Sequence, residues 1–312
     1  MLHMSAFGIA KARMSDDKKM KPKIAVIGLK GLPAFGGAAS VGENIIEQLK
    51  DTYDFTVYAI SSYTNKKGIF NGFRQIVFKS APVKILNILY YYIASALHAV
   101  FFEKYDLIHL HHRDAAFILI ILRFRYKVIV TLHGVKLTEK WAYLHPLFNM
   151  QDRLFLPFAN IITTVAPITG TTFPKFLRQK LYHIPNGINK DQIIQEKDIV
   201  EKNFILFAAA RIVPSKGCIL FIKALKKINH KGDVLVIGDI NQVSKHRDEI
   251  LNESSSLQNI KYLGLIKDKD LLFSYIRKAR FFVFPSAIEA MSMMLLEVAS
   301  LKVPIISSDI YE

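Results

Sequence analysis

Apolar runs about as long as a β-strand recur along the first half of the chain, and turn-forming residues bound them. These runs are KIAVIGL, FTVYAI, RQIVFK, DLIHLH, KVIVTLH and NIITTV. Helix-length stretches such as VGENIIEQLKD lie between most of them. Strands that alternate with helices are typical of a parallel sheet covered by helices on both faces. The pattern therefore predicts an α/β domain.

The same pattern begins again after the turn-rich stretch YHIPNGINKDQ. Strand-length runs follow at FILFAAA, DVLVIGD, IKYLG, RFFVFPS and VPIISS, with helix-length stretches at KGCILFIKALKKI, QVSKHRDEILNES, KDLLFSYIRKA and SMMLLEVASL. We expect two Rossmann-like domains, over residues 21–187 and 188–312, that face each other across a cleft. A hinge is expected near Asn186, and residues 1–20 are expected to form a flexible tail.

One uncharged segment of the first domain, ILNILYYYIASALHAVFF at residues 85–102, approaches the ~20 residues that a membrane-spanning helix needs. Its tyrosines, together with Asn87, Ser95 and His98, argue against a complete span. Two interpretations stay open. The segment is either a largely buried helix of the α/β domain or a helix that dips partly into the bilayer interface.

Composition narrows the classes of partner. The 312 residues are 51% hydrophobic, which is enough for two packed cores, and the formal net charge of +16 predicts anionic partners. No dense Arg/Lys tract or nucleic-acid-binding motif accompanies this charge, so we expect no nucleic acid and favour a phosphorylated small molecule or an anionic membrane surface. Cys218 is the single cysteine and the first residues lack a secretory signal, so a cytoplasmic location is expected.

Ligands of open parallel sheets bind beyond the carboxyl ends of the strands, so the chemistry is expected in strand-to-helix loops. The first such loop is GLKGLPAFGGAAS, which contains Gly36 and Gly37. Glycines let the backbone approach a ligand closely, and amides at the start of the next helix can face an anion. The spacing does not match the dinucleotide fingerprint G-x-G-x-x-G. A purely structural turn explains this loop equally well.

The second loop, AAARIVPSKG, carries Arg211 and Lys216 between a strand end and a helix start. A planar guanidinium can bridge two oxygens, and the ammonium adds a flexible point charge, so the pair can clamp a diphosphate. The alternative is a solvated basic pair. The loop position, with Pro214 and Gly217, favours the functional interpretation.

The third loop, in FPSAIEAMSMMLLEVASL, places Glu289 before a helix and Glu297 within it. Glu289 can accept hydrogen bonds from the hydroxyls of a ligand in the cleft, and Glu297 can reach vicinal hydroxyls such as those of a ribose. The amides of residues 290–294 between them favour a phosphate. A solvated helix face would also carry two acids, but the apolar flanks indicate burial, and a buried acid without a partner is costly.

Histidines follow two of the predicted strands. His133 ends VIVTLH and is either an active-site side chain or a satisfied structural histidine. His109 and His111 share one face of DLIHLH, but no cysteine or carboxylate completes a ligand set, so no metal is expected. Asp268 and Asp270 resemble a metal-binding acid pair, yet their place at a helix start favours capping.

The ordered set of Arg211, Lys216, FPSAIEA and Glu289-x7-Glu297, followed by SLKVPIISSD, resembles the family-four glycosyltransferases of the GT-B architecture. The resemblance extends from Lys23 along nearly the whole chain and includes KIAVIGLKGLPAFGG, VIVTLHG and YHIPNGI. It implies that Arg211 and Lys216 bind the diphosphate of the donor. It also implies that Glu289 binds the transferred sugar and Glu297 the ribose.

The resemblance implies further roles. His133 would lie beside the sugar and the acceptor, and the implied catalytic residues are His133, Glu289, Arg211 and Lys216. The other implied donor-site residues are Gly264, Ala290, Met291, Ser292 and Met293, and the implied phosphate or acceptor loop contains Gly36 and Gly37. Such enzymes move a sugar from a nucleotide diphosphate, here UDP or GDP, to an acceptor hydroxyl with retention of configuration. The implied reaction uses no protein nucleophile, cofactor or metal.

The chain departs from the family pattern at several positions. Ala210 and Ala290 stand where glycines are usual, and Glu43 comes later than the glutamate that often follows the paired glycines. Family members continue past the position of Glu312, so we expect a truncated second domain with exposed apolar surface and a loose cleft.

The expected activity is that of a metal-independent hexosyltransferase acting on a lipid-linked or surface-polysaccharide precursor at the inner face of a bacterial membrane. One alternative is a truncated, non-catalytic remnant that binds a sugar nucleotide or a partner. Another is a sugar-nucleotide epimerase of the same architecture, which the two-glutamate motif disfavours.

Overall fold

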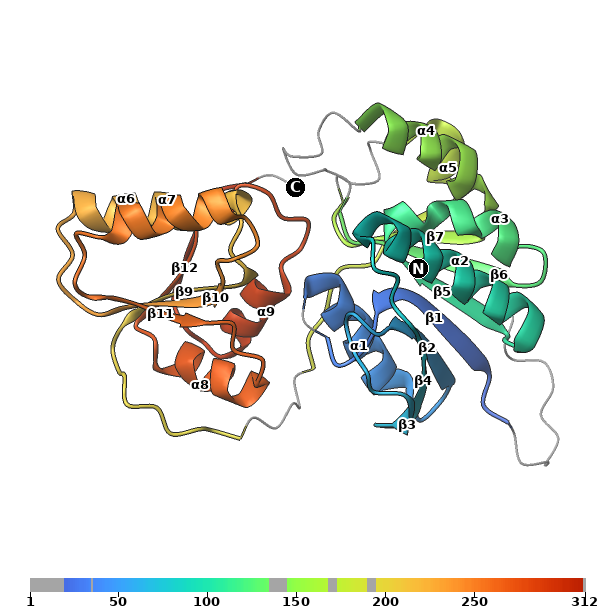
Figure 1. Ribbon diagram of the computed structural model, residues 1–312, viewed down its shortest axis with the longest axis horizontal. Helices are drawn as coiled ribbons and strands as arrows, with labels where there is room; N and C mark the ends of the chain where they lie inside the picture. Colours follow the sequence, from blue (N-terminus) through green and yellow to red (C-terminus); the bar gives the residue numbers. More distant parts are fainter. Residues whose placement is uncertain (1–19, 35, 135–144, 168–172, 190–194, 311–312) are drawn as a thin grey trace, which may run out of the picture.

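The computed structural model describes residues 20–34, 36–134, 145–167, 173–189 and 195–310. These residues form two α/β units side by side, each built on its own sheet (Figure 1). The first sheet ends before Asn186 and the second begins after it. Apart from Met20, the expected flexible tail lies outside the described residues.

The first sheet has the strand order β3-β4-β2-β1-β5-β6-β7-β8, and its neighbouring strands are parallel except for the antiparallel pair β3 and β4. The strands are β1 (Lys23–Lys30), β2 (Asp54–Ile60), β3 (Gly68–Phe70), β4 (Phe73–Phe78), β5 (Leu107–His111), β6 (Lys127–Leu132), β7 (Ile161–Thr164) and β8 (Leu181–His183). The helices are α1 (Gly37–Leu49), α2 (Lys84–Phe102), α3 (Leu119–Leu122), α4 (His145–Phe155) and α5 (Lys175–Arg178). In β1, Ala25 and Ile27 pack on the α2 side, whereas Ile24 and Val26 pack on the α1 side. Because successive side chains of a strand point to opposite faces, an unbroken apolar run serves both cores.

The second sheet has the order β11-β10-β9-β12-β13, and all its neighbouring strands are parallel. Its strands are β9 (Ile205–Arg211), β10 (Val234–Asp239), β11 (Ile260–Gly264), β12 (Phe281–Phe284) and β13 (Ile305–Ser307). Its helices are α6 (Cys218–Lys227), α7 (Ser244–Ser254), α8 (Lys269–Lys278) and α9 (Met293–Ser300). Leu206 of β9 packs with α8 and α9, whereas Phe207 packs with α6 and α7 on the opposite face (Figure 1).

The predicted α/β class is confirmed, and each predicted strand is observed within a few residues of its expected bounds. Two strands were not predicted, namely β3 and β8, each of three residues. Both lie at the edges of the first sheet. An edge strand pairs with a neighbour on one side only and does not need a long apolar run. Tyr182 and Ile184 near β8 are exposed, which fits an edge position.

The uncharged segment at residues 85–102 forms most of α2. One side of this helix is buried against the first sheet through Tyr91, Tyr92, Ala96 and Ala99. The opposite side is exposed, so the interpretation as a largely buried helix holds for one face only. Among the described residues, no helix combines the length and the apolar character needed to cross a membrane.

Candidate active site

A cavity of about 290 Å³ opens between the two α/β units, at the carboxyl ends of their parallel strands. The first unit contributes residues near the start of α1 and at the end of β6, including Gly36, Gly37 and His133. The second unit contributes Arg211, Lys216, Glu289, Ala290, Met291, Ser292, Met293 and Glu297. Gly264 ends β11 with φ of +69° and does not line the cavity, whereas Leu265, Ile266 and Lys267 do. The structure therefore brings every expected site residue except Gly264 to one cavity.

Two loops of the second unit are fastened together. The amide of Ala287 donates a hydrogen bond of 2.8 Å to the carbonyl of Ser215, and the oxygen of the Ser286 hydroxyl lies 3.1 Å from the same carbonyl. Gly217 closes the contact with φ of +73°, and a Cβ there would lie 2.0 Å from the Pro285 carbonyl oxygen. Only glycine fits this position. The basic loop and the glutamate loop are therefore held in a fixed relation.

Glu289 owes its place in an apolar segment to this contact between loops. Its carboxylate forms an ion pair with the Lys216 ammonium and accepts a hydrogen bond of 2.7 Å from the Ser286 hydroxyl. Hydrogen bonds to a charged group are stronger than neutral ones and fix its direction. The Lys216 ammonium also lies 5.9 Å from the centre of the Phe284 ring. A cation and an anion are thus oriented side by side at the cavity wall.

Glu297 lies in α9, one of the helices that line the cavity. Burial raises the pKa of its carboxyl, and the nearby Lys269 ammonium opposes the shift. No described residue forms a hydrogen bond or an ion pair with this carboxyl. Ser292 caps the helix, since its hydroxyl accepts a hydrogen bond of 3.5 Å from the amide of Leu295. An acid held in this way can accept hydrogen bonds from ligand hydroxyls.

Arg211 ends β9 and lines the cavity between the two units. Burial lowers the pKa of the His112 imidazole, Asp114 opposes this shift, and the Lys30 and Arg211 cations strengthen it. The Arg211 cation therefore interacts electrostatically with His112 of the first unit. Arg211 and Lys216 together place two cations around one space, as a diphosphate requires.

The histidines of the first unit form a neutral pair. Nδ1 of His111 and Nε2 of His133 lie 2.9 Å apart, and His111 is fully buried. Burial lowers the pKa of His133 to about 3 and lowers the pKa of His111 well below its ordinary value. Each ring is therefore uncharged at neutral pH, and one of the two donates the shared hydrogen. This bond fixes the orientation of His133 at the cavity wall.

The rings of His109 and His111 lie 4.1 Å apart, as expected for residues on one face of a strand. Nε2 of His109 is already hydrogen-bonded to the Thr131 hydroxyl at 2.7 Å. Within the described part of the chain, no group of three His, Cys, Asp or Glu side chains is arranged to hold a metal ion. Asp268 caps α8 by accepting from the amides of Asp270 at 2.9 Å and Leu271 at 3.1 Å, so the capping prediction is confirmed.

The glycine loop leaves room at the cavity. A Cβ at Gly36 or at Gly37 would meet no atom within 4 Å, so both glycines border open space. Glu43, whose position departs from the family pattern, supports the loop by accepting from the Ala34 amide at 3.3 Å. Its other carboxylate oxygen lies 3.6 Å from the Lys269 ammonium, which joins the two units.

Two cavity residues were missed by the sequence reasoning. Asn186 donates from its side chain to the carbonyl of Met291 at 2.9 Å, which connects the segment between the sheets to the glutamate loop. Lys269 lies between Glu43 and Glu297. The KDKD run at residues 267–270 is the signal in the sequence for Lys269, but the position of its acids at a helix start predicts only a cap.

Comparison with known protein families divides the chain into the same two units as the structure. Residues 35–192, about half of the 312, match the model of Glycosyltransferase Family 4, and residues 189–312 match that of Glycosyl transferases group 1. The chain belongs to glycosyltransferase family 4. An uncharacterised glycosyltransferase of Methanocaldococcus jannaschii is 27% identical over 287 residues, which cover 88% of this chain and 76% of the relative.

Solved structures show that this glycosyltransferase has the GT-B fold. Sucrose-phosphate synthase from Thermosynechococcus elongatus superposes with a TM-score of 0.75 at 18% identity, covering 93% of this chain and 82% of that one. Anabaena HepE in complex with UDP-glucose superposes with a TM-score of 0.70 at 17% identity, covering 92% and 80% respectively. At these identities the likeness concerns the fold alone.

Proposed function

We propose that this glycosyltransferase transfers a hexose from a UDP- or GDP-sugar to an acceptor hydroxyl with retention of configuration. The observation that carries the proposal is the meeting of Arg211, Lys216, Glu289 and Glu297 around one cavity, opposite His133. Two cations suit a diphosphate, and two carboxylates suit sugar hydroxyls on either side of it. The complex of Anabaena HepE with UDP-glucose supports a nucleotide-sugar donor.

The reaction follows from these assignments. The bond between the anomeric carbon and the leaving diphosphate breaks, and a bond to the acceptor oxygen forms on the same face of the sugar. The acceptor proton passes to the leaving phosphate, whose developing charge is offset by Arg211 and Lys216. Glu289 and Glu297 hold the sugar and the ribose, and His133 orients the sugar. Catalysis then rests on positioning and charge stabilisation, which the proposal assigns to side chains and helix-end amides rather than to a metal.

The acceptor belongs to the same proposal: a lipid-linked or surface-polysaccharide precursor, used at the cytoplasmic face of a bacterial membrane. The formal net charge of +16 supports an acceptor that carries phosphate or lies at an anionic surface. The exposed apolar side of α2 supports a lipid-linked molecule over a free sugar.

Incubation with a panel of UDP- and GDP-sugars in EDTA tests the proposal. We expect one donor to be consumed, with Arg211→Ala as the inactive control, and the anomeric configuration of the product to match the donor by NMR. If nucleotides bind but every donor stays intact with every acceptor offered, the non-catalytic alternative is correct. Inversion of a sugar centre without an acceptor would identify an epimerase instead.

A further inference from the structure

The outer side of α2 is unusual for a surface helix. Such helices normally carry charge on the side that faces solvent, yet residues 86–102 contain no charged side chain. The exposed stripe consists of Leu86, Leu89, Tyr90, Leu97 and Phe101. Their spacing places them on one side of the helix, opposite the side that packs on the sheet. A continuous apolar surface of this length marks an interaction site.

The apolar surface widens at the end of α2. Phe101 and Phe102 are 70% and 76% exposed, and Phe124, in the turn after α3, is 84% exposed. The turn is fixed against the helix end, because the Arg125 guanidinium donates to the Val100 carbonyl. Three phenylalanines from two elements therefore stand exposed at one end of the domain.

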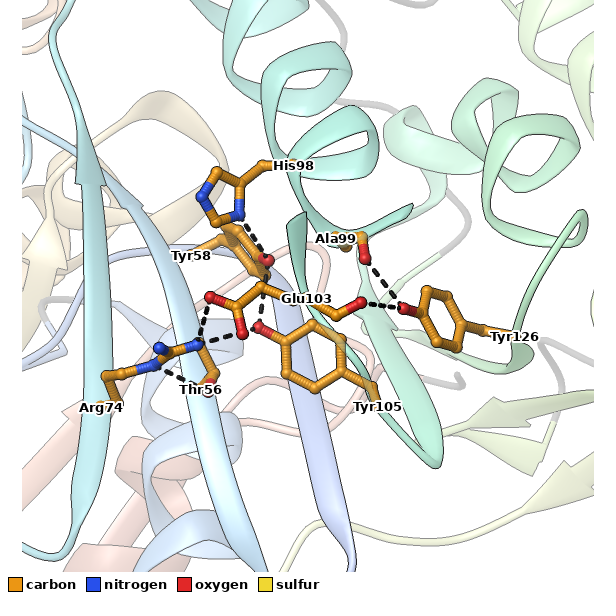
Figure 2. Close-up of polar contacts among 8 residues, drawn as sticks. All are labelled: Thr56, Tyr58, Arg74, His98, Ala99, Glu103, Tyr105 and Tyr126. Atoms are coloured by element: carbon orange, nitrogen blue, oxygen red, sulfur yellow. Dashed lines mark hydrogen bonds and ion pairs between the residues drawn. The ribbon is translucent and has the colours of Figure 1, made fainter. Parts of the chain in front are cut away.

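Polar contacts hold this end of the domain rigid. The Tyr126 hydroxyl lies at hydrogen-bond distance from the carbonyls of Ala99 at 2.9 Å and Glu103 at 2.7 Å (Figure 2). Beneath the helix, the Arg74 guanidinium pairs with the Glu103 carboxylate at 2.8 Å. The Tyr58 hydroxyl lies 3.2 Å from Nδ1 of His98 on α2. The exposed phenylalanines are thus presented on a fixed base rather than on a loose end.

Basic side chains outnumber acidic ones around the phenylalanines. Lys104, Arg123, Arg125 and Lys127 are exposed, and in the described part of the chain none of them forms an ion pair. The two acids of this region each have a partner: Glu103 pairs with Arg74, and the exposed Asp106 accepts from the Lys23 amide at 2.7 Å. An apolar stripe with an unpaired basic rim complements the headgroups and acyl chains of an anionic bilayer.

We propose that this surface binds anionic lipid bilayers with α2 lying in the interfacial plane. The α2 docking face consists of Leu86, Leu89, Tyr90, Leu97, Phe101, Phe102 and Phe124, with the rim Lys104, Arg123, Arg125 and Lys127. The phenylalanines enter the region of the acyl chains, and the rim contacts the headgroups. A protein partner would also cover an apolar face, but the basic rim favours a negatively charged surface over a neutral one.

The docking face is linked to the active site through its first turns. The Tyr91 hydroxyl, on the buried side of α2, accepts from the Gly28 amide at 2.9 Å and donates to the Tyr58 carbonyl at 2.8 Å. Gly28 belongs to the strand that leads into the glycine loop of the cavity. The buried side of α2 therefore contacts the strand that leads to the glycine loop, whereas α1, which begins at Gly37, covers the opposite face of the same sheet.

Vesicle co-sedimentation of the full chain tests the proposal. We expect binding to mixed phosphatidylcholine–phosphatidylglycerol vesicles, weak binding to phosphatidylcholine alone, and release by salt. The variant Phe101→Gln/Phe102→Gln/Phe124→Gln lowers the partition coefficient by more than about tenfold. Lys104→Gln/Lys127→Gln, which leaves the apolar surface intact, lowers it by roughly fivefold per charge at low salt.

A matched control comes from α4, where Leu147, Met150 and Leu154 are also exposed. Glutamine at these positions removes a similar apolar area and leaves vesicle binding unchanged. Thermal unfolding of each variant checks that it is folded. If the phenylalanine variant does not fold, vesicle binding by the lysine variant tests the proposal on its own. Equal vesicle binding by wild type and both α2-face variants overturns the proposal, as does loss of binding in the α4 variant alone. A self-associated wild type that becomes monomeric in the phenylalanine variant, with no vesicle binding by either, would assign the face to a protein contact.

Discussion

The two walls of the cavity handle charge in opposite ways. On the wall from the second unit, the Lys216 ammonium and the Glu289 carboxylate are paired, and Arg211 adds a further cation. On the wall from the first unit, His133 and His111 are hydrogen-bonded to each other, and burial keeps both imidazoles neutral by lowering their pKa values. One wall is built to bind a charged group, and the other is built to orient uncharged ones.

This difference teaches how the proposed reaction is divided. A leaving diphosphate gains negative charge as the bond to the sugar breaks, so it belongs against the wall with cations. The sugar ring and the acceptor hydroxyl are neutral, and a charged imidazole beside an oxocarbenium-like sugar would oppose the reaction. The neutral histidine pair avoids this repulsion. Substitutions in the neutral wall, which comes from the first unit, should therefore reduce transfer less than substitutions in the charged wall.

The largest expected effect is that of removing a cation from the charged wall. Arg211→Ala and Lys216→Ala should each lower kcat by about a hundredfold to a thousandfold, the usual cost of losing one preorganised group that stabilises developing charge. Steady-state transfer assays measure this loss. Lys245→Ala on α7, which removes an exposed lysine of the same unit, should leave kcat unchanged. If Arg211→Ala and Lys245→Ala are equally active, the charged wall does not hold the diphosphate.

The charged wall was also the more predictable one. Its residues lie in two short loops, so Arg211 with Lys216 and Glu289 with Glu297 could be recognised from local spacing. The neutral wall depends on a bond between His111 and His133, which lie on β5 and at the end of β6. A contact across neighbouring strands depends on register, and register is not written in any one segment.

The same reasoning explains what was missed elsewhere. The long strands were found because a sheet buried on both faces needs unbroken apolar runs, whereas β3 and β8 are short edge strands without such a signal. Lys269 was missed because its contact with Glu43 joins two units that are far apart in the sequence. The spacing of residues within one loop can be recognised in the sequence, but contacts between loops that are distant in the sequence become visible only in the folded structure.

A second test separates the two glutamates of the charged wall. Glu289→Ala should lower transfer by about a hundredfold while nucleotide affinity stays largely unchanged, because Glu289 is assigned to the transferred sugar. Titration calorimetry with UDP and GDP measures the affinity, and product formation measures transfer. Since Lys216 loses its ion-pair partner in this variant, Glu289→Gln serves as the comparison that keeps the size of the side chain. Weakened nucleotide binding with intact transfer would mean that the roles of Glu289 and Glu297 are interchanged.

Glu297→Gln should weaken nucleotide binding by about tenfold, the cost of replacing a charged acceptor by a neutral one. It should also stabilise the protein. Burial raises the pKa of Glu297 above its ordinary value of 4.5, so the folded chain holds this proton more tightly than the unfolded chain. The protein therefore loses stability as the pH rises from the ordinary pKa of a glutamate through the raised pKa of Glu297 in the folded chain. Glutamine has no proton to lose and removes this penalty. Thermal unfolding at neutral pH should give a higher Tm for Glu297→Gln, and a lower Tm would show that the carboxylate has a partner in the folded chain.

The smallest expected effect is a change in how Tm depends on pH when His133 of the neutral wall is replaced. Burial lowers the pKa of His133 to about 3, from an ordinary value of 6.5, so the unfolded chain binds this proton more readily. The contribution of His133 to stability is complete above pH 6.5 and is lost as the pH falls toward about 3, the reverse of the trend for Glu297. His133→Gln should therefore flatten the fall in Tm on acidification, whereas His183→Gln at an exposed position of β8 should not. An unchanged slope in His133→Gln would show that the imidazole is protonated in the folded protein, and the neutral wall would then carry charge after all.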